Sequence, residues 1–253
     1  MIEYLFVFFI GLIFGSFLSV LIHRLPLEIS LFKPARSACP HCQQKIKWYE
    51  NIPILSYIFL KGKCSNCHKP ISLLYPFIEV LTGCVTLILY MNYMSNYELV
   101  VLVTLFYILI VLSFIDLKHK EVPDHLLIIS VILVLLVGDL SDLLLFAGGF
   151  ALLELVVTFY IQNIKAKITK NNALENQSSL GDGDIPIAGV IGGLLGVELG
   201  LSAIFLAALL ALVPAAYNLI SNKEIETPFI PYLSLGLFMT LSAKFNMFYL
   251  LNF

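Results

Sequence analysis

The chain has 253 residues, of which 59% are hydrophobic and only 13% are charged. Soluble globular domains contain about half apolar and about a quarter charged residues, so this composition excludes an ordinary soluble protein and indicates an integral membrane protein. The formal net charge of −2 is close to neutral, and no nucleic-acid partner is expected; the expected surroundings are a lipid bilayer.

The first apolar run covers residues 4–22 and is long enough to cross about 30 Å of hydrocarbon as a helix. Glu3 precedes this run and Arg24 follows it, the reverse of the charge order in a cleaved signal peptide. We therefore expect an uncleaved first span that runs from outside to inside. Gly11 and Gly15 form a GxxxG pair, which predicts close packing against another helix.

Residues 23–72 form a polar insert that contains eight of the fifteen Lys and Arg residues. Two CxxC pairs lie in it, and their spacing is typical of a tetrahedral zinc site. The predicted metal ligands are Cys39, Cys42, Cys64 and Cys67. About fifty residues bury too little apolar surface to fold alone, so we expect a structural zinc ion to stabilise this module.

Other interpretations of the four cysteines are weaker. Four thiolates leave no open coordination position, which argues against zinc catalysis. A basic module in a reducing compartment favours metal over redox chemistry, although the ligands alone do not separate zinc from iron. The fifth cysteine, Cys84, lies in an apolar run and is interpreted as a small buried hydrophobe.

Further apolar runs follow the insert and, with the first, make eight candidate spans. They cover residues 73–91, 99–115, 125–137, 143–162, 185–199, 201–220 and 229–250. The fold class predicted is therefore an all-α polytopic membrane protein, with about eight transmembrane helices and the zinc module between helices 1 and 2. The stretch 185–220 fits either two short helices that meet near 198–200 or one tilted span with a re-entrant piece.

The domains expected are a first transmembrane helix (1–22), the four-cysteine module (23–72) and a transmembrane domain (73–253).

The eight predicted spans put fourteen of the fifteen Lys and Arg residues on one side of the membrane, with only Lys244 unplaced. Such segregation is what the positive-inside rule predicts, so we expect a cytoplasmic zinc module and both termini outside. The loop at 165–183 is polar and rich in Asn and Ser, and we expect it to be mobile.

Two aspartates stand at the ends of predicted spans. Asp116 closes the third run and Asp184 opens the sixth, in Gly181-Asp182-Gly183-Asp184. Two spans separate them, so both aspartates are expected at the same membrane face. Two carboxylates near each other share a proton, and the pair can then activate water and polarise a peptide carbonyl.

Structural explanations apply to several carboxylates. A carboxylate at a helix end is often a cap, and this is the preferred interpretation for Asp124; Asp182 is interpreted as a turn residue. Glu79 and Glu154 lie within apolar runs, where each is either a functional group or a buried hydrogen-bonding group.

Glycines follow Asp184 at helical spacing. Gly189, Gly192, Gly193 and Gly196 make two overlapping GxxxG pairs. They predict close packing against another helix, for which the helix ending at Asp116 is one candidate.

Taken in order, these motifs resemble those of the bacterial prepilin peptidases, the type IV leader peptidase family of Gly-x-Gly-Asp membrane aspartic proteases. The resemblance covers nearly the whole chain. It is carried by the two CxxC pairs, Asp116 and the Gly181–Asp184 turn, together with 15–26, 51–57, 62–64, Tyr75-Pro76 with Glu79, 122–126, and 228–233 with Gly236.

The resemblance implies that Asp116 and Asp184 are the catalytic pair of an endopeptidase in the bacterial inner (cytoplasmic) membrane. Its substrates would be type IV prepilins and pilin-like pseudopilins, cut after a short basic leader at the cytoplasmic face. Family members with the cysteine module often also methylate the new N-terminus with S-adenosylmethionine. The sequence departs from the family pattern at Ser19 (usually Asn), Leu74 (usually Arg) and Pro186 (usually Lys).

Two functions of other classes are weighed against this one. A membrane adaptor that displays a zinc knuckle would give the aspartates no role. An ion-coupled transporter would use Glu79 and Glu154 as a relay. The sequence indicates neither an oligomeric state nor a binding site for S-adenosylmethionine.

Overall fold

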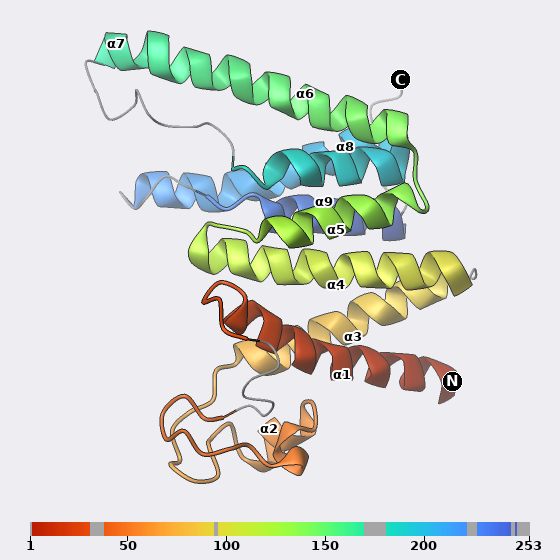
Figure 1. The fold of residues 1–253 in the computed structure, drawn as a ribbon, viewed down its shortest axis with the longest axis vertical. Helices are drawn as coiled ribbons and strands as arrows, with labels where there is room; N and C mark the ends of the chain where they lie inside the picture. Colours follow the sequence, from red (N-terminus) through yellow and green to blue (C-terminus); the bar gives the residue numbers. More distant parts are fainter. Residues whose placement is uncertain are drawn as a thin grey trace. The chain divides into compact units, whose positions relative to one another are not determined.

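The computed structural model describes residues 2–30, 38–93, 96–169, 181–221, 227–243 and 246. Within these ranges the structure is helical, with two isolated β-bridges and no strand. The elements are α1 (Ile2–Arg24), η1 (Trp48–Asn51), α2 (Leu55–Phe59), α3 (Leu74–Asn92), α4 (Asn96–His119), α5 (Asp124–Leu135), α6 (Leu140–Phe159), η2 (Tyr160–Lys165), α7 (Ala166–Thr169), α8 (Asp184–Ile220) and α9 (Ile230–Ala243). Figure 1 shows their order along the chain.

The chain forms two compact units, Met1–Ile115 and Asp116–Phe253. The first contains α1, the cysteine module, α3 and most of α4. The second contains the end of α4 and all the later helices. Residues 170–180, the centre of the loop expected to be mobile, lie outside the described ranges, as does Lys244.

In the first unit α1 packs directly on the backbone of α3. A Cβ atom at Gly11 would lie 2.7 Å from Gly83 Cα, and one at Gly15 would lie 2.7 Å from Glu79 Cα. Only glycine permits this approach, so the packing role predicted for the first GxxxG pair is confirmed and its partner is α3.

Hydroxyl groups buried in this unit bond to the helix that carries them. Thr82 and Thr86 donate to the carbonyl oxygens of Ile78 and Thr82, both at 2.7 Å. The Thr86 hydroxyl also lies 2.8 Å from Tyr107 Oη of α4. Each hydroxyl therefore has a partner without water, as an apolar environment requires.

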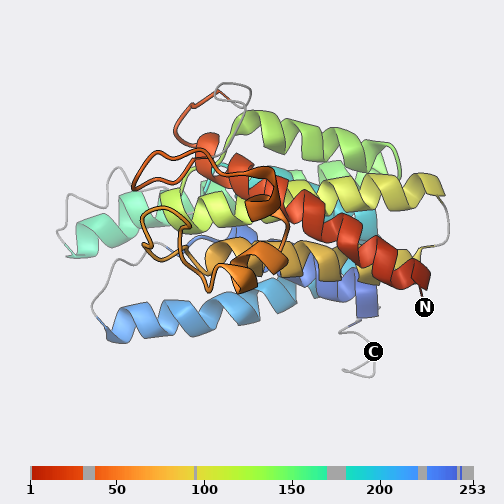
Figure 2. The same cartoon turned by 90° about the horizontal axis from the view of Figure 1, so that it is seen from below.

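In the second unit α8 consists of two arms. Gly196 has non-helical angles (φ 74°, ψ −177°), and the helical runs on either side cover 184–195 and 197–220. The chain reverses direction between the teal and the blue part of α8 (Figures 1 and 2). The bend lies two residues before the predicted meeting point, at a position where glycine tolerates the positive φ.

The α8 glycines pack against α6 and α5. A Cβ at Gly192 would lie 2.4 Å from the Phe146 ring, and one at Gly193 would lie 2.9 Å from Val134 Cγ1. The close packing predicted from the glycine spacing is therefore confirmed. Within the second unit, the contacts of these glycines are with α5 and α6.

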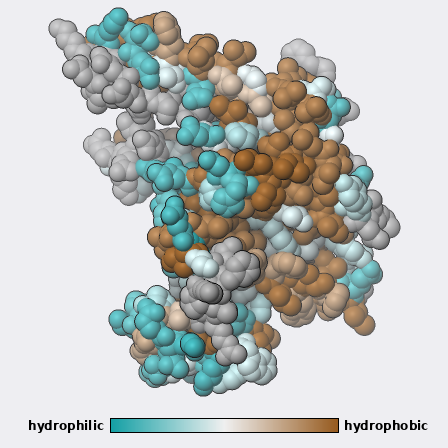
Figure 3. All heavy atoms as spheres, in the orientation of Figure 1, coloured by the Kyte–Doolittle hydropathy of each residue, from teal (hydrophilic) through white to brown (hydrophobic). Residues whose placement is uncertain are grey.

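Among the residues that the structure describes, five helical segments are long and apolar enough to cross a membrane: Ile2–Arg24, Leu74–Asn92, Tyr97–His119, Leu140–Lys165 and Asp184–Ile220. Two shorter apolar helices, Asp124–Leu135 and Ile230–Ala243, accompany them. Leu144, Leu152 and Leu155 of α6 are more than half exposed, and apolar side chains gather along the helices in Figure 3. Surfaces of this kind face lipid, so the chain is a multi-pass membrane protein.

The α5–α6 connection provides a test of the packing in the second unit. A Cβ atom at Gly138 would lie 2.2 Å from the Gly193 carbonyl oxygen, which already accepts the Asp139 N–H at 2.8 Å. We predict that Gly138→Ala destabilises the protein by about 1–3 kcal/mol, because α8 must move away. Thermal unfolding in detergent measures the effect.

The matched control is Gly148→Ala in α6, where a new Cβ meets no atom within 4 Å. This substitution removes a helix-interior glycine and is expected to be neutral or to stabilise by up to about 1 kcal/mol. Equal melting temperatures for Gly138→Ala and the unchanged protein would contradict the described packing.

Candidate active site and metal site

Asp116 lies near the end of α4 and is only 8% exposed. Its Oδ2 atom accepts the backbone N–H of Ile230, the first residue of α9, at 3.2 Å. α4 ends just beyond, where Lys120 adopts a left-handed φ of 57° and donates its N–H to the Asp116 carbonyl oxygen at 2.9 Å. The Asp116 side chain is therefore held at the start of a second helix.

Asp184 is the first residue of α8 and is 5% exposed. Its Oδ2 atom accepts the N–H of Gly181 at 3.0 Å, and its own N–H donates to the Gly181 carbonyl oxygen at 3.0 Å. This reciprocal pair closes the Gly181–Asp184 turn and fixes the orientation of the carboxyl group.

The second glycine of this turn, Gly183, is required because a side chain would not fit there, and not because of its backbone conformation. Gly183 has ordinary angles (φ −78°, ψ −18°). A Cβ there, however, would lie 2.7 Å from Val122 Cγ2 and 2.8 Å from Ile230 Cδ1. The start of α8 thus packs closely against the start of α9.

These contacts bring the two aspartates together. Gly183 precedes Asp184 and packs on Ile230, whose N–H is bound by Asp116. Asp184 lies within electrostatic reach of Asp116, and also of Glu154 on α6. The Asp116 side chain reaches the N-terminus of α9 and Asp184 begins α8, and the backbone amides of a helix N-terminus favour negative charge. Their proximity agrees with the expectation that both aspartates lie at the same membrane face, whichever face that is.

The neighbouring aspartates have simpler surroundings. Asp182 is exposed and lies in the turn, as predicted. Asp124 is the first helical residue of α5, but the N-cap is Pro123 and no side chain caps the helix. The capping interpretation of Asp124 was therefore wrong, because the chain enters α5 through a proline whose fixed φ suits a helix start.

The four predicted ligands form one cluster. The Sγ atoms of Cys39, Cys42, Cys64 and Cys67 all lie within 4.8 Å of one another. The Cys39–Cys67 and Cys42–Cys64 pairs are separated by 3.8 and 4.0 Å. Tetrahedral Zn–S bonds of about 2.3 Å require sulfur atoms about 3.8 Å apart, so this donor set fits a metal ion of that size and preference.

The two CxxC segments have the same local structure. Cys39 N–H donates to the Gln44 carbonyl oxygen, and Cys64 N–H donates to that of Lys69. The residue after each second cysteine, Gln43 or His68, has a φ of 56°. Each segment is a tight turn closed by a β-bridge, which directs both thiols of the pair toward the other pair.

Backbone donors assist thiolate formation at this cluster. The N–H of Gln44, followed by the Asn66 side chain, lowers the pKa of the Cys42 thiol to about 6. The N–H of Lys69 also lowers the pKa of Cys67, but desolvation and the three neighbouring cysteines outweigh it and raise that pKa to about 11. The spread is what four adjacent thiols produce, since they do not all ionise easily without a cation.

Glu79 on α3 is buried and contacts the cysteine module. Its Oε2 atom accepts the backbone N–H of Ile54 at 2.8 Å. The hydrogen-bonding interpretation of this residue is thus confirmed. Glu154 lies in the second unit, near Asp184.

The three positions that depart from the family pattern cause no local conflict. Ser19 is buried and donates to the Gly15 carbonyl oxygen at 3.1 Å. Leu74 begins α3 and is 41% exposed. Pro186 lies in the first turn of α8, where no intrahelical N–H bond is lost.

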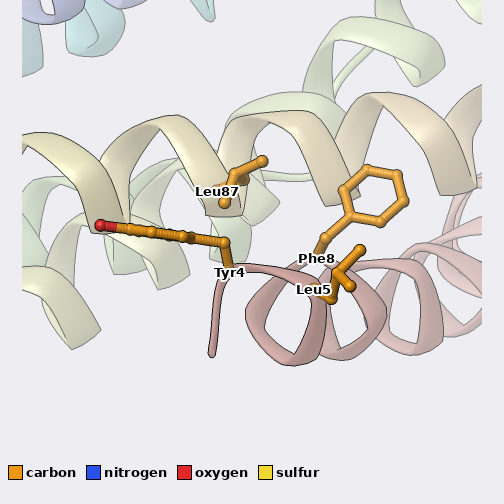
Figure 4. A pocket seen from close by; sticks show the side chains of 4 residues that line it. All are labelled: Tyr4, Leu5, Phe8 and Leu87. Atoms are coloured by element: carbon orange, nitrogen blue, oxygen red, sulfur yellow. The ribbon is translucent and has the colours of Figure 1, made fainter. Parts of the chain in front are cut away.

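An apolar hollow of about 380 Å³ lies between α1 and α3, lined by Tyr4, Leu5, Phe8 and Leu87 (Figure 4). It is open to the outside and contains no charged side chain. Its lining suits a lipid chain better than a reaction.

Comparison with known families agrees with this geometry. Residues 9–93 match the bacterial peptidase A24 N-terminal domain, and residues 103–216 match the type IV leader peptidase family. The prepilin leader peptidase/N-methyltransferase of Bacillus subtilis is 32% identical over 239 residues, which cover 93% of this chain and 92% of that protein.

The chain belongs to the type IV leader peptidase family. The enzyme of the same name from Aeromonas hydrophila is 31% identical over 98% of this chain and 93% of its own length. That of Myxococcus xanthus is 45% identical over 118 residues, 47% of this chain and 35% of the relative. No solved structure matches the chain significantly.

The sequence analysis did not predict the hydrogen-bond donors of the buried carboxylates Asp116 and Glu79. The amides of Ile230 and Ile54 are backbone groups far along the chain, and nothing in a residue's identity marks them as donors. The only signal was that both stand in motif segments, 228–233 and 51–57, that carried the family resemblance.

The cysteine cluster predicts a metal content. We expect the purified chain to carry one tightly bound zinc ion, and Cys39→Ser or Cys64→Ser to lose most of it, because three thiolates bind more weakly than four. Elemental analysis by mass spectrometry measures the stoichiometry. Cys84→Ser is the control, since Cys84 lies on α3 outside the cluster and is exposed, so its interpretation as a buried residue was wrong. Equal zinc loss in this variant would contradict the assignment.

Proposed function

We propose that this chain is a membrane aspartic endopeptidase that removes the short leader of type IV prepilins and pilin-like proteins. Asp116 and Asp184 are its catalytic pair. The observation that carries the proposal is the juxtaposition of these two buried carboxylates through the Gly183–Ile230 contact. The printed names of the relatives, which describe prepilin leader peptidases, support the substrate class.

The hydrogen bonds suggest how the pair works. Backbone amides engage the Oδ2 atom of each carboxyl group and so fix its rotation. The ionised member of the pair takes a proton from water, whose oxygen attacks the scissile carbonyl carbon while the protonated member donates to the carbonyl oxygen. Collapse of the tetrahedral intermediate breaks the C–N bond, and the departing amine takes up a proton from the pair.

The proposed location is the bacterial inner membrane, with the cysteine module and both aspartates on the cytoplasmic side and about eight crossings. The distribution of Lys and Arg supports this orientation. The two antiparallel arms of α8 support counting it as two of the crossings. A prepilin would then present its basic leader at the face where the aspartates lie.

The second proposed activity is methylation of the new N-terminus, as in the names of the relatives. S-adenosylmethionine would supply the methyl group. The proposed metal is a structural zinc ion held by the four cysteines, whose sulfur geometry supports tetrahedral coordination.

Replacing either catalytic carboxyl group tests the peptidase. Asp116→Asn and Asp184→Asn keep the size and the hydrogen-bond acceptor of each side chain but cannot exchange the proton. We expect each to lower the rate of prepilin cleavage by at least about 100-fold. Cleavage is followed by the mobility shift of a co-expressed prepilin.

Asp182→Asn and Asp124→Asn are the matched controls, because both aspartates are exposed and close in sequence to the pair. They should cleave at nearly the unchanged rate. Full activity in either Asp116→Asn or Asp184→Asn would refute the assignment, provided that the variant reaches the membrane in normal amounts.

Mass spectrometry of the processed pilin tests methylation separately. We expect leader removal and the added mass of one methyl group in the same product. A product that is cleaved but never methylated would contradict the methyltransferase proposal and leave the peptidase proposal standing. If the unchanged protein does not cleave the prepilin at all, the peptidase proposal is contradicted.

A further inference from the structure

The cysteine module has an exposed apolar stripe on its short helix. Leu55, Ile58 and Phe59 of α2 are 47%, 63% and 81% exposed. Spacings of three and four residues put them on one side of the helix. Three large apolar side chains pointing outward from a small polar module are unusual unless something covers them.

The other side of α2 faces the module. The Tyr57 hydroxyl donates to the Ile71 carbonyl oxygen at 3.4 Å, and a Cβ at Gly62 would lie 2.8 Å from that same hydroxyl. The module therefore uses Tyr57 for its own packing and turns the Leu55–Phe59 stripe away from itself.

A hydrogen bond fixes the depth of α2 relative to a membrane helix. Ile54, the N-cap residue of α2, donates its N–H to Glu79 at 2.8 Å. Glu79 is the sixth residue of α3, so it lies about 8 Å inside the start of that helix. α3 is one of the spans long and apolar enough to cross the bilayer.

This bond places α2 beside the first turns of α3 rather than beyond its end. Figures 1 and 2 show α2 in that position within the first unit. Ile54 has a φ of 59°, which is strained for a β-branched residue. The part-buried bond to Glu79 compensates part of that strain and keeps the segment at this level.

The neighbouring surface of α3 is apolar as well. Leu73 and Leu74 at its start, and Phe77 one turn later, are 72%, 41% and 58% exposed. The α2 stripe thus stands at the level of a surface that already faces lipid. Amphipathic segments typically bury their apolar side about 5–10 Å into the headgroup and acyl boundary, which agrees with the depth of α2.

The charges of the module suit an anionic membrane surface. Within the described part of the insert, residues 38–72, the basic side chains outnumber the single acidic one, Glu50. They are Lys45, Lys47, Lys61, Lys63 and Lys69. Lysines of the same module attract anionic headgroups while the stripe enters the boundary region.

We propose that α2 is a membrane-dipping wedge: Leu55, Ile58 and Phe59 insert into the interfacial zone of the same bilayer that α1 and α3 cross. The partner is an anionic phospholipid surface. Through the Ile54–Glu79 bond the wedge fixes the cysteine module against the membrane. The proposal is independent of the peptidase assignment.

The single tryptophan of the chain makes the test direct. Trp48→Phe removes it, and Phe59→Trp in that background puts one fluorescent probe in the stripe. The full chain is reconstituted into nanodiscs of an anionic and a zwitterionic phospholipid, some brominated on the upper part of the acyl chains. Zinc content shows that each variant has folded its module.

Ser65→Trp in the same background is the control, since Ser65 is exposed between the second pair of cysteines. We expect brominated lipid to quench the fluorescence of the Phe59→Trp variant at least about twofold more than that of the Ser65→Trp variant. Aqueous acrylamide should quench the two variants in the opposite order.

Two results would overturn the proposal. One is equal quenching of both probes by acrylamide with no effect of brominated lipid, which would mean that the stripe faces water. The other is a Phe59→Trp probe that lipid does not quench but that an added prepilin peptide shields from acrylamide. The stripe would then be a protein-binding surface.

Discussion

A carboxylate buried among apolar helices needs a hydrogen-bond donor, because burial removes most of the water that would solvate it. In this chain the donors are backbone amides at the starts of helices. Ile230 at the start of α9 meets Asp116, and Ile54 at the start of α2 meets Glu79. Asp184, at the start of α8, instead accepts the N–H of Gly181 in its own turn. The free N–H groups of a helix start thus become the partners that make buried acidic groups tolerable.

Close backbone packing makes these meetings possible. Gly183 lets the start of α8 approach Ile230, and Gly15 lets α1 lie against α3 at the level of Glu79. In both places a methyl group would push apart helices that pack beside a buried carboxylate. The glycines near the carboxylates are therefore needed because they leave room for a neighbouring helix. Gly196 is needed for another reason: its positive φ lets α8 reverse direction.

The cysteine module is a short insert that has too few residues to form a hydrophobic core of its own. Two nearly identical turns direct four thiols to one point, and their sulfur separations fit a tetrahedral ion. An ion held there would take the place of the hydrophobic core that so short an insert lacks. Apolar side chains of the module then need not be buried in a core, and Leu55, Ile58 and Phe59 are exposed on its surface.

The sequence by itself determined the helical membrane class, the cysteine cluster and the choice of the proposed aspartate pair, since each depends on composition, spacing or the parity of crossings. It also predicted that α1 and α8 pack through glycines. Only the tertiary structure decided which helices those glycines contact, that Asp124 is not a cap, and that 184–220 folds back at Gly196. The reason is physical: a residue's identity specifies its own size and charge, whereas the partners of Asp116 and Glu79 are backbone amides, which every residue but proline carries. Only the folded chain selects which amide reaches them.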